Sequence, residues 1–127
     1  MKERAKELKT QATHEEALKD QLAKIKELDA SDRDLALQVH EIILKAAPNL
    51  KAKTWYGMPN YNDESGKSIV FFQPAGKFKA RYSTLGFNET ADLDEGEMWP
   101  TAFALLSITP AVEKKITALV RQAAGLK

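Results

Sequence analysis

The chain has 127 residues, a length that suits one domain over residues 1–127. Its 19 Lys and Arg residues nearly balance 18 Asp and Glu residues, whereas a dedicated nucleic-acid-binding protein is usually clearly basic. There is no Cys, which excludes disulfides, thiolate metal sites and cysteine nucleophiles and fits a cytoplasmic protein. No apolar run suits a signal peptide or a membrane helix, so we expect no membrane partner.

The first half of the chain predicts two helices. Residues 1–12 are charged and lack an apolar face, so we expect a flexible N-terminal extension. Apolar residues at helical spacing predict helices at 14–28 and 32–47, begun by the capping residues Thr13 and Ser31. The short connection between them favours a helical hairpin.

The second half predicts a sheet and one more helix. β-branched and aromatic residues over 67–73 predict a buried strand, and alternation over 77–84 predicts a half-buried antiparallel partner. Residues 101–108 fit a third strand or a short buried helix, and their alternation favours the strand. Thr109 caps a helix predicted at 110–124. The fold class is therefore α+β, an antiparallel sheet packed against two N-terminal helices and one C-terminal helix.

Aromatic residues gather in the segment 55–61, where Gly57 and Pro59 predict a shaped apolar bend. One interpretation is a pocket wall, with Tyr56 and Tyr61 facing a cavity. The other is core packing where the helices meet the sheet. The residues predicted to bind a small molecule are Trp55, Tyr56, Met58, Tyr61, Phe78, Tyr82 and Trp99.

Two charged groups are further candidates. Lys77, Lys79 and Arg81 would share one face of the predicted strand. They would either bind a phosphate or carboxylate ligand or an acidic partner, or discourage edge pairing. The acidic stretch from Glu89 to Glu97 is either a solvated loop or a site for iron or another divalent ion. Its candidate ligands are Asp92, Asp94, Glu95 and Glu97.

Catalysis has little support in the sequence. The two histidines, His14 and His40, lack a second metal ligand at helical spacing. There is no nucleophile elbow and no glycine-rich phosphate loop, so a non-enzymatic role is favoured. The expected partner is an unidentified small molecule, and no cofactor is predicted apart from the metal ion considered above.

A family resemblance rests on the motif Trp55-Tyr56-Gly57-Met58-Pro59-Asn60-Tyr61 and the two segments after it, 66–72 and 76–82. Together they resemble the core of the YdhG-like domain family, with its Tyr-Gly-Met-Pro motif, Gly-Lys turn and apolar-aromatic strand. The resemblance runs from about Leu18 to Val120. Most of that family has no assigned function, and one branch is described as a frataxin-like iron chaperone. The resemblance therefore implies, as an alternative function, an intracellular iron-binding chaperone using surface carboxylates.

Overall fold

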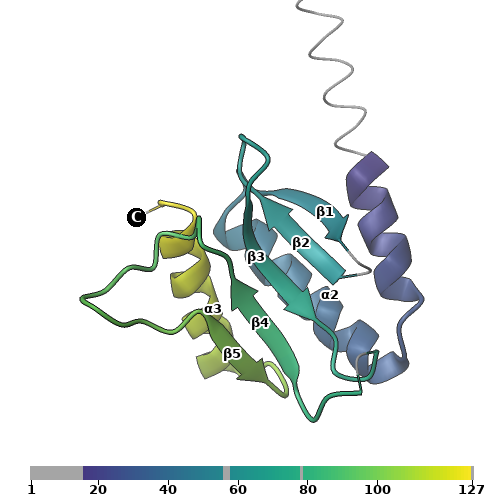
Figure 1. Ribbon diagram of the computed structural model, residues 1–127. Coiled ribbons are helices and arrows are strands. Elements are labelled where there is room, and N and C mark those ends of the chain that lie inside the picture. The colour runs from purple at the N-terminus through teal and green to yellow at the C-terminus, as the bar shows by residue number, and fades with distance from the viewer. Residues whose placement is uncertain (1–15, 56–57, 78, 127) are drawn as a thin grey trace, which may run out of the picture.

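The structure is a computed structural model that describes residues 16–55, 58–77 and 79–126. In these residues five strands form one antiparallel sheet, and each strand pairs only with its neighbours along the chain (Figure 1). The strands are β1 (Lys51–Trp55), β2 (Met58–Asn62), β3 (Ser68–Gln73), β4 (Ser83–Phe87) and β5 (Ala102–Leu105). Together with the helices, the sheet gives the α+β class predicted from the sequence.

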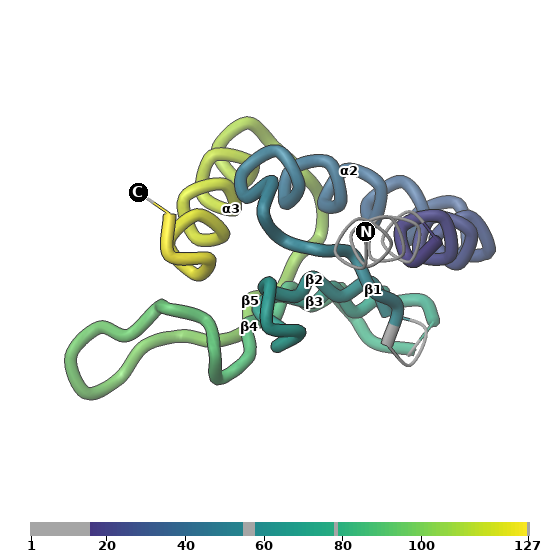
Figure 2. The backbone as a smooth tube through the Cα atoms, turned by 90° about the horizontal axis from the view of Figure 1, so that it is seen from above, coloured from purple at the N-terminus to yellow at the C-terminus, as the bar shows by residue number. Residues whose placement is uncertain are grey.

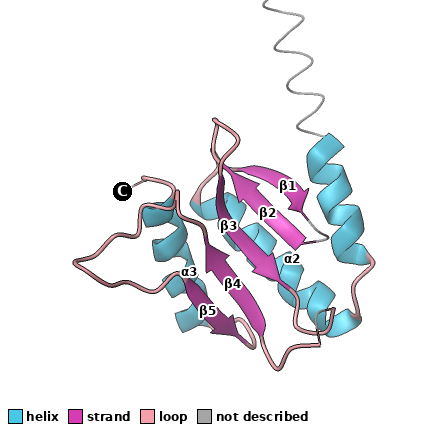
Figure 3. Cartoon of the chain, in the orientation of Figure 1, coloured by secondary structure: helices cyan, strands magenta, loops and turns pink. Residues whose placement is uncertain are grey.

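The helices of the described chain all lie on one face of the sheet (Figure 2). They are the helix of residues 16–26, α2 (Ala30–Ala46) and α3 (Pro110–Ala123). The opposite face, called the open face below, carries no helix in the described ranges (Figures 2 and 3). None of the helices described is long and apolar enough to cross a membrane.

The helix ends agree with the prediction at α3 and differ at α2. Thr109 caps α3, since its Oγ1 accepts a hydrogen bond from the Val112 backbone N–H at 3.2 Å. Gly125 follows the last turn of α3 with a φ of +76°, a conformation that suits glycine. The expected cap at Ser31 is wrong, because α2 already begins at Ala30 after Asp29. The other predicted cap, Thr13, lies outside the described residues.

The core lies between the helices and the sheet. All three helices contribute to it, so the apolar spacing of the sequence identified the correct helix faces. Its most deeply buried apolar side chains include Ile25, Val39, Ile43, Val70, Phe72, Leu85 and Val120.

The segment 55–61 is not the bend that the sequence analysis predicted. Trp55 is the last residue of β1 and pairs with Met58, the first residue of β2. The two strands therefore form a hairpin, and residues 56–57 between them lie outside the described ranges. Pro59 has no backbone N–H to donate to a neighbouring strand. It lies just before the part of β2 that pairs with β3, where the first pair is Asn60 with Phe71.

The predicted strand at 77–84 is also wrong, because β4 begins only at Ser83. The preceding loop is held against the start of α2, where the Asp32 carboxylate accepts the N–H groups of Gly76 and Lys77, each at 3.2 Å. Lys79 has a φ of +53°, which is incompatible with an extended strand. By contrast, the strands predicted at 67–73 and 101–108 are confirmed as β3 and β5.

Candidate functional site

The side chains of β2 alternate between the two faces of the sheet. The Tyr61 hydroxyl lies 2.9 Å from Nδ1 of His40 on α2, so Tyr61 points to the helices. Its neighbours Asn60 and Asn62 therefore belong to the open face. On β1 the register places Lys53 beside Asn60 and Lys51 beside Asn62. Two lysines thus flank two asparagines on the face without helices.

A chain of hydrogen bonds joins Asn60 to the neighbouring strand and loop. Its Oδ1 accepts the backbone N–H of Tyr61 at 2.9 Å and the hydroxyl of Ser68. The side-chain amide of Asn88 donates in turn to Oγ of Ser68 at 2.5 Å. A backbone N–H can only donate, so it fixes the orientation of the Asn60 amide. The group that Asn60 can still offer to a ligand is its NH2.

These side chains line a hollow of about 190 Å³, called the amide hollow below. Although they line a hollow, Asn60 is only 4% exposed and Asn62 only 8%. Oδ1 of Asn62 is buried and has no hydrogen-bond partner among the described residues. An unpaired buried polar atom typically costs about 1–3 kcal/mol. The lining residues are Lys53, Asn60, Asn62, Gly66, Ser68 and Asn88.

The aromatic ring of Phe71 lies on the open face, on the strand next to Asn60 of the amide hollow. Phe71 is the cross-strand partner of Asn60 on one side and of Gly86 on the other. A Cβ added to Gly86 would lie 2.2 Å from Cζ of Phe71, so the ring lies directly over the glycine. A ligand in the hollow therefore has both polar groups and an apolar neighbour within the same sheet face.

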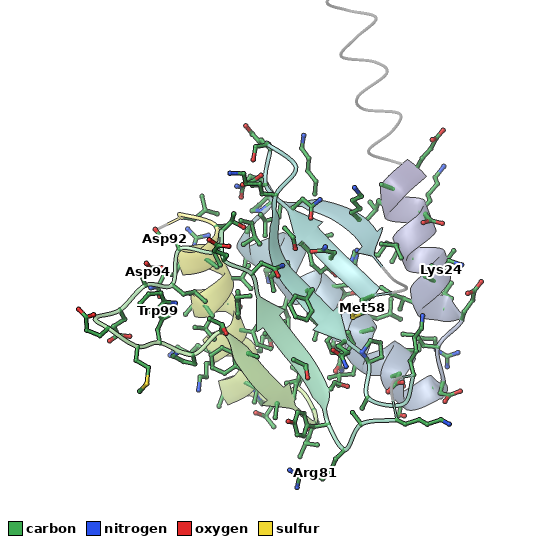
Figure 4. The ribbon with its side chains drawn as sticks, viewed as in Figure 1. Lys24, Met58, Arg81, Asp92, Asp94 and Trp99 are labelled. Atoms are coloured by element: carbon green, nitrogen blue, oxygen red, sulfur yellow. The ribbon has the colours of Figure 1, made fainter. Side chains whose placement is uncertain are left out.

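The structure does not bring together the aromatic residues predicted to form a pocket. Tyr61 was expected to face a cavity, but it is fully buried and its hydroxyl is paired with His40, so this expectation is wrong. Met58 is half-buried at the start of β2, well away from Trp99 in Figure 4. Tyr82 is exposed just before β4. The side chain of Trp55 and residues Tyr56 and Phe78 lie outside what the structure describes.

The predicted cationic face does not exist as a strand face. Lys77, Lys79 and Arg81 are exposed, but they belong to the loop before β4, so the period-two argument for their alignment fails. Arg81 lies over the ring of Tyr82, with Cζ 5.5 Å from the ring centroid.

The acidic stretch is a loop between β4 and β5, as its composition suggested. Ala91 and Leu93 are buried and anchor it, while Asp92 and Asp94 are exposed, as are Glu95 and Glu97 (Figure 4). No group of three or more His, Cys, Asp or Glu side chains suited to a metal ion occurs among the residues described.

The two titratable groups behind β2 are kept uncharged by burial. Burial lowers the pKa of His40 from its ordinary value of 6.5, and the nearby Glu41 carboxylate opposes this effect only partly. Burial raises the pKa of the Tyr61 hydroxyl. The neutral imidazole and the protonated phenol can therefore share one hydrogen bond inside the core, which gives His40 a structural role.

Other hollows are weaker candidates. One, of about 340 Å³, lies between α2 and the start of α3 and includes Glu41 and Glu113, which are exposed. Another, of about 250 Å³, includes Asp32, whose carboxylate already holds the loop before β4. A smaller one of about 150 Å³ between β5 and α3 is almost entirely apolar. Of these four hollows, the amide hollow combines deeply buried polar side chains with an unpaired polar atom. Two further buried atoms of the described residues without a partner, Oε1 of Gln21 and Oγ1 of Thr54, line none of the four.

The residues that line the amide hollow were not predicted from the sequence. A signal was nevertheless present, since Lys51 and Lys53, like Asn60 and Asn62, are separated by two positions. It becomes meaningful only when both segments are known to be strands that pair in register.

Comparisons of the chain with family models, curated proteins and solved structures gave no match. The function is therefore argued from the site alone.

Proposed function

We propose that this protein is a non-enzymatic binding protein of the cytoplasm, and that it holds a small polar molecule in the amide hollow. The observation that supports this most directly is Asn62, a side chain more than nine-tenths buried beside a hollow, with an unpaired Oδ1. Buried polar atoms in proteins normally find a partner. A bound molecule with a hydrogen-bond donor would provide one.

Packing alone accounts less well for the arrangement. Lysines on β1 are expected on an edge strand, because charge discourages pairing with another chain. That role needs no buried amides on the neighbouring strand. The hydrogen bonds from Tyr61 and Ser68 to Asn60 fix one of these amides in a single orientation, and such preorganisation is typical of a binding site.

The proposed site keeps a smaller apolar surface than the aromatic pocket predicted from the sequence. Met58 and Phe71 are both half-buried, and the register places Phe71 on the open face beside Asn60. A small apolar part of a ligand could rest there while its polar part enters the hollow. A role without catalysis is preferred because the chain carries no nucleophile motif.

A hollow-filling variant tests the proposal. Ser68→Val suits a strand, removes the hydroxyl and adds bulk to the wall of the hollow, whereas Ser107→Val makes the same change at an exposed position after β5. Thermal unfolding would be followed with a library of small carboxylates, phosphates, amides and polyols. We expect at least one compound to stabilise the native protein and Ser107→Val but not Ser68→Val. Equal stabilisation of all three proteins would contradict the proposal.

A further inference from the structure

The polarity of the amide hollow indicates which ligand chemistry it suits, provided that the proposed binding function holds. The oxygen of Asn60 is occupied by two donors, the Tyr61 N–H and the Ser68 hydroxyl. The one proton of that hydroxyl is used in the same bond. Asn60 therefore presents N–H groups to a ligand, and these favour an oxygen acceptor.

The charge around the hollow has the matching sign. Lys53 lines it, and Lys51 lies on the same face beside Asn62. The lining residues include no carboxylate. Asp63, which directly follows β2, uses its Oδ1 to accept hydrogen bonds from Ser65 and from the Lys67 backbone N–H. An anionic group in the hollow would meet the Lys53 ammonium and the Asn60 amide donors.

Asn62 adds a second requirement. Its buried Oδ1 is an acceptor without a partner among the described residues, and an oxygen anion alone cannot donate to it. A hydroxyl next to the anionic group would supply the missing donor. The volume of about 190 Å³ is smaller than the roughly 300–1,000 Å³ of sites for drug-sized molecules, so a ligand of few atoms is favoured.

We infer that the amide hollow binds a small hydroxylated anion, with the anionic oxygens at Lys53 and the Asn60 NH2 and the hydroxyl at Asn62. A hydroxy-carboxylate and a protonated phosphate share this chemistry. The two Lys–Asn cross-strand pairs, Lys53 with Asn60 and Lys51 with Asn62, place the required groups in neighbouring rows of the sheet.

Four probes separate the parts of this inference: glycolate, acetate, glycolamide and inorganic phosphate. Acetate lacks the hydroxyl, and glycolamide lacks the charge. Proton–nitrogen correlation spectra of the full chain report binding through the side-chain NH2 signals of Asn60 and Asn62. We expect glycolate to shift these signals at lower concentration than acetate and at about tenfold lower concentration than glycolamide. A response to phosphate with none to glycolate would assign the anion as phosphate.

Matched substitutions then test the residues. Asn60→Asp keeps the oxygen that accepts the Tyr61 N–H but replaces the NH2 donor by a negative charge, and Asn49→Asp makes the same change at an exposed position. Lys53→Gln removes one charge at the hollow, and Lys114→Gln removes one on α3. We expect about tenfold weaker glycolate or phosphate binding for the two hollow variants and native binding for both controls.

Three results would overturn the inference. The first is equal binding of glycolamide and glycolate, the second is native affinity in both hollow variants, and the third is no shift with any of the four probes. In each case, a library compound whose stabilising effect depends on Ser68 would still support the proposed binding function. If no such compound is found, both the binding function and the inferred ligand class are contradicted.

Discussion

The Tyr61 hydroxyl lies 2.9 Å from Nδ1 of His40, on the helix side of the strand whose other side carries the amide hollow. Tyr61→Phe removes the hydroxyl and leaves a buried ring nitrogen without this partner. We expect the free energy of unfolding to fall by about 1 kcal/mol, measured by urea denaturation. If Tyr61 instead lined a pocket and faced solvent, the same substitution would lower the free energy of unfolding much less. Unchanged stability would therefore contradict the buried hydrogen bond.

The same pair predicts a pH dependence of stability. Burial lowers the pKa of His40 below 6.5 in the folded state, so the unfolded chain takes up its proton first as the pH falls. Stability should therefore be highest above the unfolded-state pKa and decrease as the pH falls from about 6.5 towards the lower folded-state pKa. Urea midpoints measured between about pH 7.5 and pH 5 test this.

The matched variant for this pH dependence is His40→Gln, which keeps a polar partner for Tyr61 but does not titrate. Its stability should change much less over the same interval. Asp63 is a separate case, because hydrogen bonds from Ser65 and Lys67 lower its pKa from 3.8. The stability that Asp63 contributes to the folded state is present above pH 3.8 and is lost only as the pH falls from there towards its lower folded-state pKa. If stability near pH 6 changes with pH equally in the native protein and in His40→Gln, the effect belongs to another group.

Asp32 should control the order of the loop before β4. Its carboxylate accepts the N–H groups of Gly76 and Lys77, so Asp32→Ala leaves both donors without this acceptor. We expect a loss of about 1–3 kcal/mol of unfolding free energy, together with faster hydrogen exchange at these two amides. Asp34→Ala, a change at an exposed position two residues further along α2, serves as the control. Unchanged exchange in Asp32→Ala would show that the loop is held by other contacts.

Gly86 and Phe71 should be energetically coupled. A Cβ at position 86 would lie 2.2 Å from the Phe71 ring, so Gly86→Ala must displace the ring and should destabilise the protein by about 1–3 kcal/mol. In a background of Phe71→Ala the same change should be much better tolerated. Denaturation of the two single variants and the double variant gives the coupling energy, and purely additive effects would contradict the contact.

The carboxylates of the loop between β4 and β5 should bind divalent iron weakly. Asp92 and Asp94 are exposed, and each additional ligand would have to be ordered on binding. Anaerobic calorimetric titration with Fe²⁺ measures this. Submicromolar binding that disappears on combining Asp92→Asn with Asp94→Asn would instead support the iron-chaperone alternative.

Sequence periodicity predicted the helices and two strands well, because their apolar residues face a single core. The hairpin of β1 and β2 was missed because Lys51 and Lys53 make β1 polar, and Pro59 is unusual within a strand. Alternation over 77–84 was misleading, since the start of that segment is hydrogen-bonded to Asp32, more than forty positions earlier.

The candidate site was harder to predict than the fold. Asparagines are common in turns, so Asn60 appeared to belong to the bend at 55–61 and Asn62 to the polar turn after it. Their shared face follows from the strand register, and the orientation of the Asn60 amide follows from a hydrogen bond to the Tyr61 backbone. Residue type alone carries neither piece of information.

The order of the strands also has a kinetic consequence. Each strand pairs with the next one along the chain, so the sheet can assemble by successive closure of short segments, and low contact order favours rapid folding. A hydrogen bond of 3.0 Å between described residues far apart in the sequence joins the Arg121 side chain on α3 to the carbonyl of Ala46 at the end of α2. Docking of α3 is thus expected to be a late event, and a nascent chain can form its hairpins before its C-terminal helix has been synthesised.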